Sequence, residues 1–288
     1  MAKRCLVCGS DHQKTIYHDT LVKCEPCGFV TTNIEVDEGT LKNIYSVSYF
    51  KGEEYADYPS DKKVIVSNFK LRISRIRKLF PSHSMTNILE IGCAYGFFAE
   101  EIIRQFPLAF YQGYDVSEEA CNFACKELHL NIKCLDFLTD EIIRPYSDVF
   151  MWDVIEHLSH PEKYIEKISR NILPGGKFFI TTGDIGALVP RIMKSRWRLI
   201  HPPSHLHYFT RNSLFCLLEK NGFIIKDISY PGTSRSLKQI FYSLFLLHRK
   251  GSRLTHFLYR NIPEWWQITI NTGDIMFLMA EKKVNNER

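Results

Sequence analysis

The sequence predicts an α/β fold built on a doubly wound, mainly parallel sheet. An apolar strand at residues 88–91 runs into a glycine turn, and a helix follows directly, which is how such a sheet usually opens. Acidic residues follow several of the later apolar strands. Runs such as FFI at 178–180 show no alternation with polar residues, so burial on both faces is expected, as for parallel strands.

The composition is that of a globular protein, with 45% hydrophobic and 24% charged residues among 288, and the net charge of +5 is modest. The first residues lack the apolar run of a secretory signal, and the apolar segment 240–247 is too short to span a bilayer. Nine cysteines, four of them grouped near the N-terminus, do not form a dense disulfide framework. We therefore expect a cytoplasmic protein.

The grouped cysteines have the spacing of a metal site. Two C-x2-C pairs are separated by fifteen residues: Cys5 with Cys8, and Cys24 with Cys27. Four thiolates at this spacing complete a tetrahedral Zn²⁺ shell and leave no open position for catalysis. The spacing predicts a structural zinc ribbon over residues 1–40.

Residues 41–86 are expected to connect this ribbon to the main domain. The connector is rich in tyrosine, including Tyr45, Tyr49, Tyr55 and Tyr58. An amphipathic helix is then indicated by apolar residues at helical spacing. Residues 62–78 hold seven Lys or Arg and no acid, which fits either a solvated face or a face that meets phosphate.

The glycine turn after the first strand narrows the class of cofactor. Residues 90–96 read E-x-G-x-x-x-G, and Phe97 occupies the place of the third glycine of a dinucleotide fingerprint. A pyrophosphate site is therefore not predicted, and no phosphate-binding P-loop motif is present.

With this turn, Asp115 and Asp136 after the next two strands, and the run 148–184, the chain resembles class I S-adenosylmethionine (SAM) methyltransferases from residue 87 to residue 283. The resemblance implies a seven-stranded Rossmann-like methyltransferase sheet over residues 87–288, with the last two strands antiparallel. It also implies a helical insertion at about residues 232–271, before the last strand.

The same resemblance implies SAM as cofactor and places residues around it. The expected cofactor residues are Glu90, Gly92, Cys93, Ala94, Gly96, Asp115, Val116, Asp136, Phe137 and Asp153. Asp115 would accept hydrogen bonds from the ribose hydroxyls. Taken singly, the glycines also fit ordinary turns, and Asp115 also fits a helix cap.

The stretch HPPSHLHYFT at 201–210 follows the fifth strand on the cofactor side. Its histidines fit metal ligands, turn residues anchoring a lid, or a base that takes a substrate proton. We predict His205 as the proton acceptor and His157 as the second candidate. Tyr58, His207 and Tyr208 are expected to shape the acceptor pocket, with His207 on the same face of an extended loop as His205.

The ribbon, the tyrosine-rich segment and the histidine loop together resemble relatives of sugar C-methyltransferases. In those enzymes the loop often carries a Glu–His pair, whereas Ser204 precedes His205 here, and they have a further C-terminal domain. The predicted function is methyl transfer to oxygen or carbon of a small molecule, such as a sugar or a carrier-linked glycan. The alternative is a zinc-ribbon methyltransferase of ribosomal RNA.

The insertion is basic and aromatic, with no acid before Glu264. It fits a helical cap on the sheet edge, a dimer surface, or a peripheral membrane contact through residues 237–266. The sequence leaves three matters open: the oligomeric state, the acceptor, and whether segments 62–78 and 235–260 bind phosphate, lipid or neither.

Overall fold

The computed structural model describes residues 4–17, 19–34, 58–246, 252–263 and 266–284. The predicted connector tyrosines Tyr45, Tyr49 and Tyr55 lie outside the described residues. None of the described helices is both long and apolar enough to cross a membrane.

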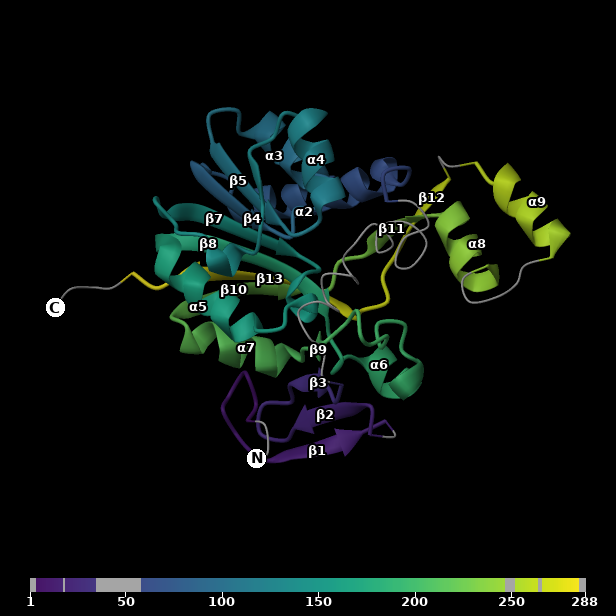
Figure 1. Cartoon of the computed structure of the whole chain (residues 1–288), viewed down its shortest axis with the longest axis horizontal. Helices are drawn as coiled ribbons and strands as arrows, with labels where there is room; N and C mark the ends of the chain where they lie inside the picture. The colour runs from purple at the N-terminus through teal and green to yellow at the C-terminus, as the bar shows by residue number, and fades with distance from the viewer. Residues whose placement is uncertain (1–3, 18, 35–57, 247–251, 264–265, 285–288) are drawn as a thin grey trace.

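The centre of the molecule is a seven-stranded sheet in the order β10-β13-β8-β7-β4-β5-β6 (Figure 1). In chain order its strands are β4 (Asn87–Ile91), β5 (Phe110–Asp115), β6 (Ile132–Cys134), β7 (Tyr146–Trp152), β8 (Ile172–Gly183), β10 (Phe223–Ser229) and β13 (Ile275–Lys282). β13 runs antiparallel to both neighbours, and the pairs from β8 to β6 are parallel. The predicted α/β methyltransferase sheet is therefore confirmed, including its antiparallel last pair.

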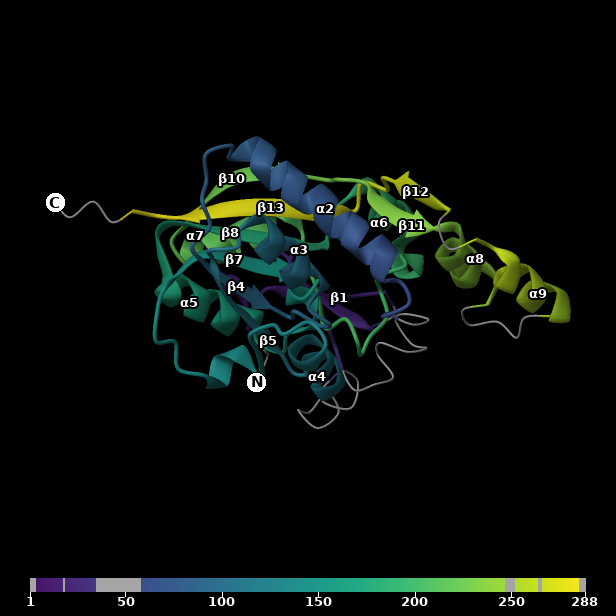
Figure 2. The same ribbon diagram turned by 90° about the horizontal axis from the view of Figure 1, so that it is seen from above.

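One face of the sheet is covered by the helix before β4 and by the helices that follow β4 and β5 (Figure 2). They are α2 (Lys62–Leu79), α3 (Phe97–Gln105) and α4 (Glu118–Lys126). Phe69 and Ile73 of α2 pack with Phe98 of α3 and Phe150 of β7 in one buried cluster. The period of these apolar residues on α2 explains why one side of the helix is buried.

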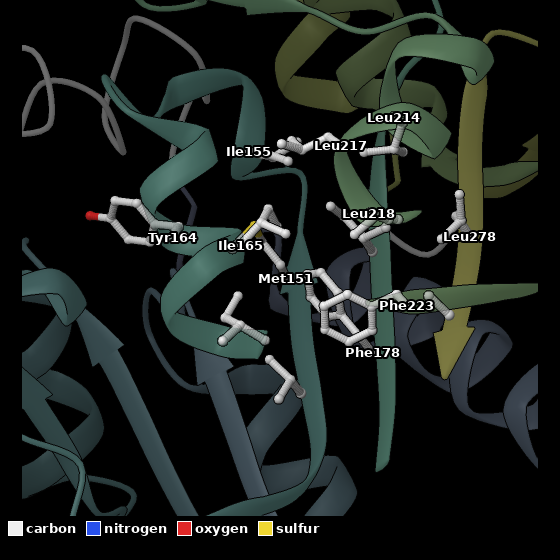
Figure 3. Packing of buried hydrophobic residues seen from close by; sticks show 14 of the residues in the cluster. Met151, Ile155, Tyr164, Ile165, Phe178, Leu214, Leu217, Leu218, Phe223 and Leu278 are labelled. Atoms are coloured by element: carbon white, nitrogen blue, oxygen red, sulfur yellow. The ribbon is translucent and has the colours of Figure 1, made fainter. Parts of the chain in front are cut away.

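The opposite face is covered by α5 (Pro161–Asn171) and α7 (Arg211–Lys220). Figure 3 shows how Ile165 of α5 and Leu218 of α7 pack against Met151, Phe178 and other apolar side chains of the strands. A sheet buried on both sides needs apolar residues at successive positions, which explains the lack of alternation in β7 and β8.

The N-terminal ribbon forms a second sheet that includes a strand from the main domain. Its own strands are β1 (Gln13–Ile16), β2 (Leu21–Cys24) and β3 (Val30–Thr32). The fourth strand is β9 (His207–Tyr208), which pairs antiparallel with β3. The histidine stretch expected to be a loop therefore joins the ribbon to the domain at the lower edge of Figure 1.

The insertion between β10 and β13 forms an outer lobe at the opposite end from the C-terminus (Figures 1 and 2). We call outer lobe the hairpin β11 (Thr233–Ser236) and β12 (Gln267–Ile270) together with α8 (Leu237–Phe245) and α9 (Arg253–Asn261). Between β8 and β9 the chain also forms α6 (Leu188–Met193) and a 3-10 turn at Lys194–Arg196.

Candidate functional site

The carboxyl ends of the parallel strands meet at one edge of the sheet, which we call the cofactor edge. β4 ends at the glycine turn, β5 at Asp115, β6 before Asp136 and β7 before Asp153. In doubly wound sheets ligands bind at this edge, because the connections there leave a crevice between them.

The glycine turn has a backbone that side chains rarely tolerate. The φ angles of Gly92, Ala94 and Gly96 are +73°, +45° and +76°. A Cβ atom on Gly92 would lie 2.3 Å from a methyl of Val154, so this glycine is required for a close approach between turn and β7. The amides of Gly92 and Cys93 both donate to the carbonyl of Tyr114, which fixes the turn against β5.

Asp115 binds the turn from the neighbouring strand. One carboxylate oxygen accepts from the amide of Ala94 (2.8 Å) and the other from the amide of Ser117 (2.9 Å). Burial raises the pKa of Asp115, and the two amides oppose that shift. Each carboxylate oxygen has a further lone pair, so Asp115 can accept additional hydrogen bonds from a bound ligand.

Glu90 and Cys93 are buried at the base of the turn, with only 2% and 4% of their surfaces exposed. The hydroxyl of Tyr111 donates to Glu90 at 2.5 Å, and burial raises the pKa of Glu90 well above its usual value. The structure thus places these two expected cofactor residues beneath the turn, where they support it.

The remaining expected cofactor residues lie in three environments. Asp136 accepts from the amide of Leu138 and the hydroxyl of Tyr164, and Phe137 is fully buried. Val116 is 43% exposed just after Asp115.

Asp153, the last of the expected cofactor residues, has a φ of +55°, and its carboxylate accepts a hydrogen bond from Arg72 at 2.7 Å. Arg72 belongs to α2 and has no signal in a local sequence pattern.

Tyr58, an expected substrate residue, is buried beside the glycine turn. Its ring stacks on Tyr95 of the turn, with centroids 5.6 Å apart, and on Phe97 at the start of α3, 5.8 Å apart. The tyrosine-rich segment therefore reaches the cofactor edge at this residue.

The histidines form a cluster at the end of β7. The rings of His205 and His157 meet edge to face with centroids 4.5 Å apart, and those of His205 and His201 are 3.9 Å apart. His157 donates from Nδ1 to the carbonyl of Ser204 at 2.8 Å, which makes Nε2 the acceptor nitrogen of its neutral ring.

Glu156 completes this cluster and was not anticipated. Ligand atoms of Glu156, His157 and His205 all lie within 4.8 Å of one another. Thr182 donates to the Glu156 carboxylate at 2.9 Å, and the amide of Leu206 donates to its carbonyl. The Glu–His pair absent from the loop sequence is thus supplied by another segment. Glu156 lies in a 3-10 turn, Ile155–His157, just after β7, and its local signal was an acidic residue between the apolar Ile155 and His157.

This cluster can act in two ways. Burial lowers the pKa of His157 to about 4 and that of His205 well below its usual value, so both imidazoles are neutral at pH 7. The same burial makes each a weaker base than an imidazole in water. Two imidazoles and a carboxylate are also ligand types for a divalent cation. The sequence suggested His201, His205 and His207 as possible metal ligands. In the structure the side chains that lie close enough together are instead Glu156, His157 and His205.

His207 and Tyr208 face the ribbon. Nδ1 of His207 lies 3.0 Å from Oγ1 of Thr31, and its ring packs on Phe29. The hydroxyl of Tyr208 donates to the carbonyl of His205 (3.1 Å). His207 thus contacts Thr31 of β3 and Phe29 just before it. The rings next to that of His205 are those of His157, His201 and Tyr208.

The four ribbon cysteines are gathered as their spacing predicts. Their sulfur atoms lie within 4.8 Å of one another, with 3.6 Å between Cys5 and Cys27 and 3.5 Å between Cys8 and Cys24. The hydrogen bond between Cys5 and Cys27 lowers the pKa of Cys5 to about 5 and raises that of Cys27, so the two sulfurs share one proton. This donor set fits a tetrahedral Zn²⁺ ion.

The basic helix α2 is largely neutralised by neighbouring acids. Lys62 pairs with Glu100, Arg72 with Asp153 and Arg75 with Asp227, and Lys70 lies 3.9 Å from Glu101. Four of the seven cations of segment 62–78 thus have carboxylate partners, whereas Arg77 and Lys78 line a hollow together with Lys70 and Arg104, so this part of the helix stays basic.

Comparisons with known proteins agree with this architecture. Residues 65–226, more than half of the chain, match a family model described as a methyltransferase domain. The match spans both helices and strands of the cofactor edge, including the glycine turn and Glu156.

Among curated proteins, the chain is 27% identical over 236 residues to the mitochondrial ubiquinone biosynthesis O-methyltransferase of Mus musculus, covering 70% of this chain and 60% of that protein. It is 28% identical over 103 residues to a ubiquinone biosynthesis O-methyltransferase of Coxiella burnetii, covering 33% and 43%. The chain therefore spans less than two thirds of the length of these relatives.

Among solved structures, magnesium protoporphyrin IX methyltransferase of Synechocystis PCC 6803, with bound SAH, aligns with a TM-score of 0.54 and 14% identity, over 86% of this chain and all of that one. A 4+2 cyclase named SpnF aligns with a TM-score of 0.50 and 18% identity, over 74% and 80%. These likenesses show the fold, and the cyclase shows that the fold also serves other chemistry.

Proposed function

Because the chain belongs to the methyltransferase domain family, we propose that it transfers the methyl group of SAM to an oxygen or carbon of a small-molecule acceptor. The observation that carries this proposal is the cluster of Glu156, His157 and His205 at the cofactor edge. Methyl transfer to a hydroxyl needs a group that takes up the hydroxyl proton, and this cluster supplies one.

The residues of the cofactor edge fit SAM. Gly92 and Gly96 let the backbone approach a ligand closely, and the Asp115 carboxylate can accept hydrogen bonds from ribose hydroxyls. Asp136 and Asp153 end the neighbouring strands and are assigned to the same ligand. When bound, SAM supplies an electrophilic methyl group on a sulfonium.

His205 is assigned as the proton acceptor. Bound SAM would supply the methyl group, and its methyl–sulfur bond would break to leave S-adenosylhomocysteine as the acceptor oxygen bonds to the carbon. The imidazole of His205 would take the proton of that oxygen. The burial that lowers the pKa of His205 disfavours the resulting cation, and the nearby Glu156 carboxylate offsets part of that cost. His157 is the second candidate for the same role, and Tyr58 is assigned to the acceptor pocket.

Oxygen is the favoured target because the curated relatives named above are O-methyltransferases. A sugar or a carrier-linked glycan is also a suitable acceptor, because methyl transfer to its hydroxyl groups needs the same kind of base. Ribosomal RNA is the less supported acceptor, because most cations of the basic helix already have carboxylate partners.

The ribbon is assigned a structural zinc. Its four cysteines use up a tetrahedral shell, so no position remains for substrate or water. Its role would be to hold β3 against β9 and thereby the histidine cluster.

The test uses SAM carrying a labelled methyl group, incubated with the full chain and with cell extract separated into small-molecule, lipid, glycan and nucleic-acid fractions. We expect label in a small molecule, and less label with Asp115→Ala at a SAM concentration near the dissociation constant of the unaltered chain, because this variant should bind SAM more weakly. Label found in RNA would overturn the proposed acceptor class, and no label in any fraction would overturn the activity.

A further inference from the structure

The outer lobe projects from one end of the sheet, and its two helices stand apart from the layers that bury the core (Figures 1 and 2). It is joined to the body through its hairpin. Asn68 of α2 makes two hydrogen bonds to the backbone of Ser234 in β11, one as donor at 3.0 Å and one as acceptor at 2.7 Å. The body thus anchors the lobe at β11.

The helix α9 presents an apolar stripe to solvent. Leu254, Phe257 and Leu258 are 65%, 63% and 44% exposed, and positions 254, 257 and 258 share one face of a helix. Phe245 of α8 and Trp266 before β12 are also exposed. A monomeric globular protein normally exposes apolar residues singly, so a grouped set indicates an interaction surface.

The charge around this stripe has one sign. Residues 233–270, which span the outer lobe, contain six Lys or Arg and a single acid, Glu264, and α9 itself has no acid. Arg253 and Arg260, at the two ends of α9, are exposed beside the apolar residues. Exposed aromatic and aliphatic side chains beside arginines, on a helix with no acids, have the character of an interfacial helix that lies on anionic lipid.

Other occupants fit this surface less well. Two copies of α9 packed on each other would bring like charges together, because the helix carries no acid to pair with Arg253 or Arg260. RNA would use the cations, but an aliphatic pair such as Leu254 and Leu258 gives it neither stacking nor phosphate contact.

The helix α2 connects the outer lobe to the cofactor edge. The same helix that binds Ser234 by Asn68 carries Arg72, whose guanidinium donates to Asp153 at the end of β7. One helix therefore contacts both the hairpin of the outer lobe and the cofactor edge.

We propose that the outer lobe docks the protein on an anionic lipid surface, with Leu254, Phe257 and Leu258 inserted among the lipid chains and Arg253 and Arg260 at the headgroups. The contact is peripheral and goes beyond the proposed methyl transfer, which does not depend on it.

The test is flotation of the full chain with vesicles of phosphatidylcholine alone or of phosphatidylcholine with one quarter phosphatidylglycerol. We expect binding to the anionic vesicles, weaker binding to the neutral ones, and release when NaCl rises from about 0.1 to 0.5 M. The variant Leu254→Ser/Phe257→Ser/Leu258→Ser should lower the partition coefficient by about tenfold or more. Arg253→Gln/Arg260→Gln should lower it by about tenfold on anionic vesicles only.

The matched control is Leu108→Ser/Ile143→Ser, since these two residues are exposed apolar side chains outside the lobe. That variant should bind vesicles as the unaltered chain does, and SAM affinity should be the same for all variants, which checks their folding. Equal vesicle binding by the triple-serine variant would overturn the proposal. So would absence of binding to anionic vesicles, a lipid-free dimer that the triple substitution abolishes, or retention of RNA in place of vesicles.

Discussion

Thr31 of the ribbon and His207 of the main domain lie 3.0 Å apart, from Oγ1 to Nδ1, although they are 176 residues apart in the chain. Their strands pair in one sheet, and His207 is two residues from His205 of the histidine cluster. The ribbon is therefore built onto the segment that holds the proposed base.

This relationship predicts that the ribbon positions the base. Thr31→Val removes a hydroxyl that contacts His207 and donates to the carbonyl of Leu206 (3.3 Å). Loss of these two hydrogen bonds, at about 1 kcal/mol each, corresponds to a fall in turnover of about fivefold to thirtyfold, with SAM affinity unchanged. Steady-state kinetics and calorimetry would check this.

The matched control is Thr32→Val, because the Thr32 hydroxyl makes only a local, exposed bond to Ile34. Equal turnover in the two valine variants would show that the link between ribbon and loop has no part in positioning.

Removal of the zinc should loosen more than the ribbon. Cys24→Ser takes away one of four ligands, so the metal should be lost and amide hydrogen exchange should speed up in residues 4–34 and also in 205–209, because β9 pairs with β3. SAM binding should persist, since the glycine turn lies on β4. Cys216→Ser serves as the control, because this cysteine lies outside the group of four. Faster amide exchange in the ribbon alone, with residues 205–209 unchanged, would contradict the predicted link between the ribbon and β9.

Asp115→Ala should weaken SAM binding by about 1–3 kcal/mol, because buried ribose hydroxyls would lose their acceptor and the turn would lose the bond to Ala94. Isothermal calorimetry would measure the affinity. Glu118→Gln, an exposed acid at the start of α4, should leave it unchanged. An unaltered affinity in Asp115→Ala would reject the assignment of this residue.

His205→Gln should lower turnover by about 10²–10⁴-fold and spare SAM affinity, because the glutamine side chain does not accept a proton at neutral pH. Glu156→Gln should also lower turnover, since the carboxylate near the imidazolium is lost. His160→Gln, on an exposed histidine, is the control. If His205→Gln instead lowers the melting temperature and keeps the rate per folded molecule, the residue is structural.

The buried histidines should make the fold sensitive to mild acid. Burial lowers the pKa of His207 to about 4, whereas the unfolded chain binds this proton near pH 6.5. Its contribution to stability is therefore complete above about pH 6.5 and is lost as the pH falls toward 4, by up to about 3 kcal/mol. His157 and His205 act in the same direction.

Urea unfolding between pH 7 and 4.5 would measure this slope. His207→Gln should flatten it, and His12→Gln, on an exposed side chain, should not. An unchanged slope in His207→Gln would show that folding does not lower the pKa of His207, and would contradict this prediction.

The sequence by itself determined the sheet and the two groups of residues with local patterns. Gly92 and Gly96 stand a fixed distance apart after an apolar strand, and the cysteine pairs have the spacing of a zinc ribbon. The glycine turn and each C-x2-C pair involve residues only a few positions apart, so the local sequence is enough to indicate the backbone geometry that they need. Continuous apolar strands likewise indicate burial on both faces.

Only the tertiary structure decided which distant side chains meet. Glu156 faces His205, Arg72 binds Asp153, and His207 contacts Thr31 because β7, α2 and β3 pack at particular places. No local pattern encodes such pairs, since each depends on the burial of whole elements against one another. For the same reason the basic residues of α2 could be seen in the sequence, whereas the carboxylates that neutralise them lie on other elements and are identified only by packing.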